Sequence, residues 1–161
     1  MSTTEERPVI DLSTPLSMES SFRFPLQSAD SRREILWGAA LLVLLPGIGW
    51  FLNMGHRIVV VHRMQHGQLP WPAWHDYGRL FRHGVIVAGG MLYYYVPGFT
   101  FAYAAWHFDS ALLAFVAAPL LLAATIAIPG YMSHYCQEFD PAEIYDPLRA
   151  LRRCIEGGGA Y

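Results

Sequence analysis

The sequence HGVIVAGGMLYYYVPGFTFAYAAWH, residues 83–107, carries no formal charge, and neither does SALLAFVAAPLLLAATIAIPGYMSHYCQ, residues 110–137. Each reaches or exceeds the roughly 20 apolar residues that a helix needs to cross a bilayer. Only Phe108 and Asp109 separate the two stretches. The sequence therefore predicts an integral membrane protein of the all-α class, with a transmembrane hairpin whose helices cover 84–106 and 110–131.

A third charge-free stretch, ILWGAALLVLLPGIGWFLNMGH, covers residues 35–56 and is interrupted by Pro46 and Gly47. The arms on either side have about 13 residues, or near 20 Å at about 1.5 Å per residue. Such arms are too short to cross a hydrocarbon core of roughly 30 Å twice. We therefore predict a re-entrant or interfacial helical hairpin over 31–65. A kinked full span is the alternative.

Pro-Gly steps occur in all three stretches, and proline removes a backbone donor and crowds the preceding turn. In a membrane such a step kinks a helix or marks a turn. We expect a turn at Pro46-Gly47-Ile48-Gly49, a kink within a span at Pro97-Gly98, and the end of a span near the cytoplasmic face at Pro129-Gly130.

Arginine supplies all eleven basic residues. Short loops that carry basic residues stay on the cytoplasmic side, so the arginines orient the chain. The loop at Asp109 has none, which favours a multi-pass protein of the inner membrane with a cytoplasmic N-terminus. The residues expected at the cytoplasmic membrane surface are Arg57, Arg63, Arg79, Arg82, Arg149, Arg152 and Arg153.

The chain divides into a tail and one membrane domain. Residues 1–30 are polar and predict a flexible tail, whereas 31–161 predict a single helical domain. Within that domain we expect an amphipathic linker over 66–83 and a short amphipathic cytoplasmic helix over 140–156.

A short repeat supports these two surface segments. Asp76, Arg79 and Arg82 recur at the same spacing as Asp146, Arg149 and Arg152. An apolar helix follows the first copy but not the second. We expect either that the repeat has degenerated or that the product of the gene is longer.

The composition gives no sign of catalysis. The chain has 161 residues, of which 53% are hydrophobic and 15% charged, and it contains no paired carboxylates, Ser-His-Asp arrangement, Walker loop or HExxH element. Within the charge-free stretches only histidines can ionise, so the buried acidic or basic groups typical of ion paths are not expected. The sequence predicts a protein that is not an enzyme.

Histidines are the candidate ligands. An imidazole in an apolar setting can bind the iron of haem or the metal of a chlorophyll-type pigment, and His107 and His134 are the candidates for this role. His62 and His66 stand four residues apart, but no third ligand is tied to them by spacing, so no metal site is predicted.

Several motifs between residues 22 and 161 resemble an uncharacterised family of prokaryotic membrane proteins, domain of unknown function 4013. The family has an early Phe-Arg-x-Pro, an apolar run broken by Pro-x-x-Gly, a Gly-Tyr-x-x-Arg element, a Leu-Pro-x-Trp-x-Asp linker and a glycine that opens the next helix. The matching residues here are Phe22-Arg23-Phe24-Pro25, Pro46 with Gly49, Gly55-His56-Arg57, Leu69-Pro70 with Trp74 and Asp76, and Gly84. His56 stands where the family often has tyrosine, and Trp71-Pro72 lengthens the linker. The resemblance implies no activity.

We therefore expect a non-enzymatic accessory or structural subunit of a larger bacterial membrane complex. Its partners would be the lipid bilayer and other membrane subunits, with no nucleic acid. One alternative is a transport or channel module built on Pro-Gly-broken helices. A second is a haem- or pigment-binding membrane subunit.

Overall fold

The computed structural model describes residues 28–149 and 152. Most of these residues are helical and none forms a strand, which confirms the all-α prediction. Nearly all of the predicted N-terminal tail lies outside the described residues, as does Arg153. The elements are α2 (Ala29–Leu44), α3 (Pro46–Gln65), α4 (Tyr77–His107), α5 (Ala111–Glu138) and α6 (Ala142–Tyr145).

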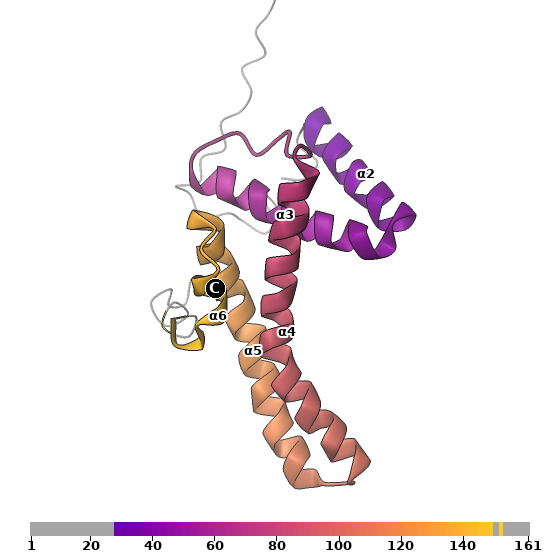
Figure 1. Cartoon of the computed structure of the whole chain (residues 1–161), viewed down its shortest axis with the longest axis vertical. Coiled ribbons are helices and arrows are strands. Elements are labelled where there is room, and N and C mark those ends of the chain that lie inside the picture. Colours follow the sequence, from indigo (N-terminus) through magenta and orange to yellow (C-terminus); the bar gives the residue numbers. More distant parts are fainter. Residues whose placement is uncertain (1–27, 150–151, 153–161) are drawn as a thin grey trace, which may run out of the picture.

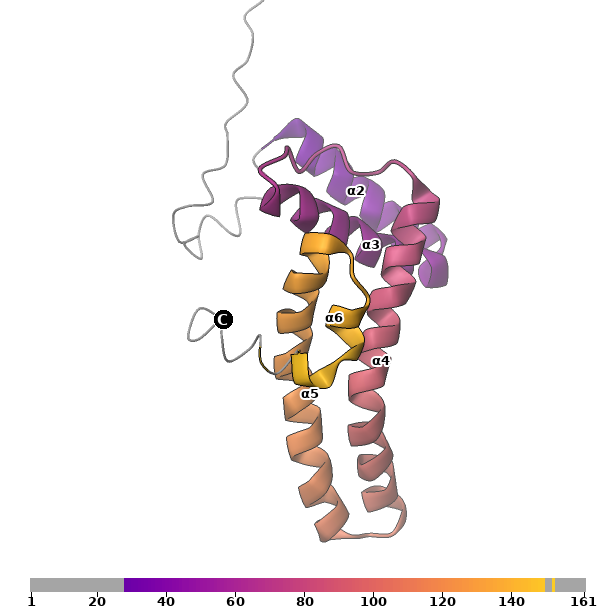
Figure 2. The same cartoon turned by 60° about the vertical axis from the view of Figure 1, so that its left-hand side comes forward.

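Helices α4 and α5 form a long antiparallel hairpin, with their connecting loop at the lower end in Figures 1 and 2. Both are long and apolar enough to cross a membrane. In their most apolar stretches only 22% of the α4 residues and 17% of the α5 residues are buried. A core helix of a soluble protein would be mostly buried, so the exposure favours lipid as the surrounding medium.

The start of α4 corrects two predictions. We expected a separate amphipathic segment up to residue 83 and a helix opened by Gly84, but the first two turns of α4 already cover Tyr77–Gly84. Asp76 determines this start, because its side chain accepts a hydrogen bond from the Arg79 backbone N–H at 3.1 Å. Residues 77–83 of the predicted surface segment and the candidate span are therefore one helix of 31 residues, about 46 Å long.

Two of the Pro-Gly steps lie inside helices, and the kink expected at Pro97-Gly98 and the end of a span expected at Pro129-Gly130 stay predictions. Helix α5 continues through Pro129-Gly130 to Glu138, so this step does not end the helix. Helix α4 likewise continues past Pro97, and Gly98 packs against Leu121 of α5. A Cβ on Gly98 would lie 2.6 Å from a Leu121 methyl group. Gly98 therefore permits close packing of the two helices.

The first charge-free stretch forms two helices that meet at one residue. Helix α2 starts with a capping box between Ser28 and Ser31, and α3 starts at Pro46, which tolerates the first helical position because it has no N–H to satisfy there. The break is at Leu45, so Gly47 and Gly49 already belong to α3. Gly49 instead lies against the Leu41 carbonyl, where a Cβ would be 2.2 Å away.

Two glycines allow α3 to cross α4 with backbone against backbone (Figure 1). A Cβ on Gly55 would lie 1.7 Å from the Leu80 carbonyl oxygen, and one on Gly84 would lie 1.9 Å from that of Phe51. This crossing, rather than the opening of a helix, explains Gly84. Apolar side chains fill the space on both sides of the crossing, among them Leu52, Ile58, Val59, Leu80 and Val87.

Of the amphipathic helix predicted over 140–156, residues 150, 151 and 153–156 lie outside the described residues, and the described part is not one continuous helix. Helix α6 has only four residues, and Asp146 interrupts the helical course. The segment packs on α4 and α5, because Ile144 is fully buried and lies at Gly90. The Tyr94 hydroxyl donates to the Ile144 carbonyl, and the Tyr145 hydroxyl donates to that of Ile86, both at 3.0 Å.

The short repeat has a structural meaning. Asp146 accepts a hydrogen bond from the Arg149 backbone N–H at 3.2 Å, as Asp76 does from that of Arg79. Each aspartate therefore caps the start of a helical turn, which accounts for the shared spacing.

Candidate functional site

A buried carboxylate and a buried imidazole join α2, α3 and the linker over 66–76 at the upper end of the molecule. Glu34 of α2 and His56 of α3 are 8% and 7% exposed. The Glu34 Oε2 atom lies 2.8 Å from His56 Nε2 and accepts a second hydrogen bond from the Ala73 N–H at 2.9 Å. A buried carboxylate needs such donors to replace water. We call Glu34, His56, Trp71 and Trp74 the Glu34–His56 cluster.

Two tryptophans from the 66–76 linker cover this pair. The His56 ring stacks on Trp74 with centroids 4.2 Å apart and lies parallel to Trp71 at 5.8 Å. Trp74 also donates its indole N–H to the Glu34 carbonyl at 2.9 Å. The Trp71-Pro72 step thus places one of the two rings that cover the imidazole.

Burial determines the charge of the imidazole. Desolvation lowers the pKa of His56 below its ordinary value of 6.5 and outweighs the opposing effect of the Glu34 carboxylate. The positive charge of Arg63 lowers this pKa further. His56 is therefore neutral at pH 7 and donates its Nε2–H to the carboxylate. Chemically, the cluster holds a hydrogen bond between an imidazole and a carboxylate, and the His56 ring can take up a proton in acid.

A second polar cluster lies where α3, α4 and the end of α5 meet. The Tyr135 hydroxyl is 2.7 Å from His83 Nδ1, and His62 Nδ1 is 2.6 Å from the Cys136 carbonyl oxygen. Phe139 has a left-handed backbone at the end of α5. The centroid of its ring lies 4.1 Å from that of the His62 ring and 4.3 Å from that of the His83 ring. Like the first, this cluster fastens separate helices together.

The two predicted haem or pigment ligands lie far apart. His107 is exposed at the last residue of α4, next to the loop, and stacks on Tyr103 at 6.1 Å. His134 is half-buried near the other end of α5. They therefore cannot share one ligand, and cofactor binding at either one stays a prediction. Among residues 28–149 and 152, no three His, Cys, Asp or Glu side chains gather in a way that could hold a metal ion.

The predicted surface arginines fall into two groups. Arg63 bonds to the Pro72 carbonyl and to His75, and Arg149 contacts three carboxylates, so both are engaged within the protein. The other described ones, Arg57, Arg79, Arg82 and Arg152, are exposed, and Arg149 is exposed despite its ion pairs. Arg79 also lies over the Phe139 ring at 5.9 Å.

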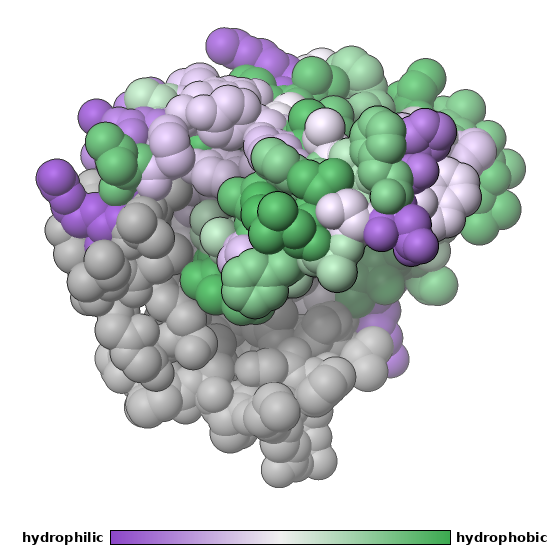
Figure 3. All heavy atoms as spheres, turned by 90° about the horizontal axis from the view of Figure 1, so that it is seen from below, coloured by the Kyte–Doolittle hydropathy of each residue, from purple (hydrophilic) through white to green (hydrophobic). Residues whose placement is uncertain are grey.

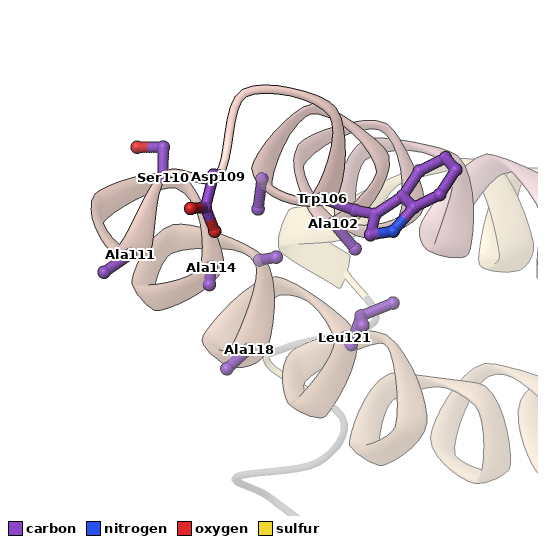
Figure 4. A pocket seen from close by; sticks show the side chains of 10 residues that line it. Ala102, Trp106, Asp109, Ser110, Ala111, Ala114, Ala118 and Leu121 are labelled. Atoms are coloured by element: carbon purple, nitrogen blue, oxygen red, sulfur yellow. The ribbon is translucent and has the colours of Figure 1, made fainter.

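A shallow groove separates α4 from α5 next to their loop, and alanines line most of it (Figure 4). Trp106 stands at one side and Asp109 at the loop, whereas Leu121 closes the other end. The lining alanines are Ala102, Ala105, Ala111, Ala114, Ala117 and Ala118.

Fold and site together define a helical protein with two candidate membrane spans and a buried polar cluster beside them. The family described as "Protein of unknown function (DUF4013)" matches residues 38–134, and the chain belongs to this family. No match was found among curated proteins or among solved structures. The matched region contains His56, both tryptophans of the cluster and the glycines of the α3–α4 crossing.

Sequence reasoning missed Glu34. It stands between two arginines and the first charge-free stretch, where an exposed residue is the ordinary expectation. One signal was available, because Ser31, Glu34, Gly38 and Leu41 are spaced as one face of a helix and form the buried face of α2.

Proposed function

We propose that this protein is a non-enzymatic membrane subunit whose α4–α5 hairpin spans the bilayer and packs against another membrane protein. One observation carries the spanning part: both helices are apolar, yet most of their surface faces outward. Leu92, Phe115 and Leu122 are 64%, 78% and 61% exposed. Exposure of this apolar surface to water would cost free energy, whereas contact with lipid tails would not.

The charges support an orientation. Arg79 and Arg82 lie at the upper end of α4, and the loop at the lower end carries only Asp109. Short loops with basic residues stay in the cytoplasm, so we assign the upper end to that side of an inner membrane. Aromatic residues mark both ends, with Tyr77 and Trp106 about 43 Å apart along α4, close to the bilayer thickness including headgroups.

The subunit role is supported by the alanine-lined groove and the exposed Phe99, Tyr103 and Trp106 around the same end of α4. Small residues let membrane helices approach closely, and aromatic side chains add contact area. The transport alternative has less support, since α4 and α5 continue past Pro97 and Pro129, whereas the helical course is interrupted before Pro46.

Membrane integration is tested by alkaline carbonate extraction, which should leave the protein in the membrane pellet. The subunit role is tested by native mass spectrometry of protein solubilised from its host. We expect a stoichiometric partner that is lost in Ala118→Leu, which fills the groove, and retained in Ala123→Leu on the same helix. Ala123 is exposed and does not line the groove. An isolated monomer would contradict the subunit role.

A further inference from the structure

The α2–α3 junction bears an apolar surface that the remainder of the described protein leaves open. Val43 and Leu44 are 81% and 72% exposed, and Leu45 and Ile48 about half. Figure 3, which views the molecule from the loop end of α4–α5, shows hydrophobic side chains along the right-hand edge, on the side where this junction lies. We call residues 42–48 the hairpin tip.

Polarity along α2 follows its axis rather than one face. Its first turns carry Asp30, Arg32 and Arg33, whereas residues 35–44 contain only apolar side chains and small residues. Outside the narrow seam to α3, almost all of this second part is exposed. A helix that is apolar all round needs an apolar medium, and the gradient along α2 indicates which end enters it. The apolar part measures about 15 Å, half of a roughly 30 Å hydrocarbon core.

The height of the crossing on α4 identifies that medium. Helix α3 meets α4 at Leu80 and Gly84, which lie about 35 to 40 Å from His107 at about 1.5 Å per residue. If the loop end of α4 marks one edge of a roughly 30 Å core, the crossing lies just outside the other edge, at headgroup depth. In both Figure 1 and Figure 2, α2 begins above this crossing and runs down to the hairpin tip, so the tip lies nearer the membrane core than the charged start of α2.

Charge and hydrogen bonding at the base of the hairpin agree with this depth. Arg32, Arg33 and Arg57 are exposed there, where anionic headgroups would lie. Trp37 is half exposed and donates its indole N–H to the Tyr77 hydroxyl at 2.9 Å. Tryptophan and tyrosine favour this interfacial layer.

We infer that the hairpin tip inserts into the cytoplasmic leaflet of the bilayer and is covered by lipid, without crossing the membrane. The Glu34–His56 cluster and the α3–α4 crossing hold the hairpin at the angle that this insertion requires. The inference rests on the proposed spanning role of α4–α5, which places the leaflet at this height.

The test uses a nitroxide spin label on the full chain in vesicles of phosphatidylcholine and phosphatidylglycerol. Single-label variants are Leu44→Cys at the hairpin tip, Arg33→Cys at the base and Leu122→Cys on α5. Cys154→Ser removes one native thiol, and Cys136 stays because it is buried. The measurement is the ratio of collision rates with oxygen, which enters lipid, and with a nickel chelate, which stays in water.

We expect this ratio to be several-fold higher at Leu44→Cys than at Arg33→Cys and to approach the value at Leu122→Cys. Equal ratios at Leu44→Cys and Arg33→Cys, with Leu122→Cys still in lipid, would overturn the insertion alone. Water access at Leu122→Cys would instead overturn the spanning role of α5. Dipolar broadening at Leu44→Cys would show that a second copy covers the tip and would overturn the assignment to lipid.

Discussion

The upper end of the molecule and the lower half of the α4–α5 hairpin use the same helices in opposite ways. At the upper end, α3 lies on the α4 backbone, and Glu34, His56 and Trp74 form specific hydrogen bonds. In the lower half, the side chains of α4 and α5 mostly point outward, and their hydrogen bonds are mainly within each helix. The upper end is stabilised by its own contacts, whereas the lower half depends on what surrounds it.

The largest effect should come from the helix crossing. Gly55→Ala places a methyl group 1.7 Å from the Leu80 carbonyl oxygen, which belongs to the backbone and cannot rotate away. We expect a loss of about 3 kcal/mol in the free energy of unfolding, measured by denaturant titration in detergent micelles. Gly47→Ala is the matched control, because nothing lies within 4 Å of its Cβ position. Equal stability of the two variants would show that the crossing is looser than the structure implies.

The next effect concerns the Glu34–His56 cluster. Glu34→Ala removes the acceptor of two buried donors, His56 Nε2–H and the Ala73 N–H. We expect a loss of about 2 to 3 kcal/mol in the same titration, because the orphaned donors keep their desolvation cost. Asp30→Ala, an exposed acidic residue on the same helix, should change stability far less. If both variants lose the same free energy of unfolding, the buried Glu34–His56 pair stabilises the fold no more than an exposed carboxylate does.

A smaller effect should appear with pH. Because the pKa of His56 is lowered in the folded protein, the unfolded chain binds more protons below about pH 6.5, and folding becomes less favourable as pH falls. The slope has an upper limit of about 1.4 kcal/mol per pH unit for one group. Comparison with His56→Gln, which retains a donor for Glu34, isolates this contribution. Parallel pH profiles of the two proteins would rule out His56 as its source.

The smallest effect should occur in the lower half. Leu122→Ala alters an exposed side chain, so we expect a change within about 0.5 kcal/mol. Leu80→Ala at the upper end removes a side chain that is 1% exposed and should cost about 3 kcal/mol. If Leu122→Ala costs as much as Leu80→Ala, a protein contact rather than detergent or lipid covers that part of α5.

The sequence by itself determined the features that depend on local composition. Long charge-free stretches predict apolar helices whatever surrounds them, and Pro46 ends the preceding helix because it crowds that turn. The helical class and the family resemblance were therefore predictable. Pro97 and Pro129, unlike Pro46, lie within helices, since a helix held by its neighbours can continue past a missing hydrogen bond.

Only the tertiary structure decided which polar residues became buried. Glu34 resembles a surface residue until His56 and the Ala73 N–H, 22 and 39 positions away, surround its carboxylate. Gly84 resembles the start of a helix until Phe51 lies against it, and the residues around Ile144 resemble a surface helix until α4 and α5 bury that side chain. These outcomes depend on contacts between distant segments, and composition within a short window does not encode them.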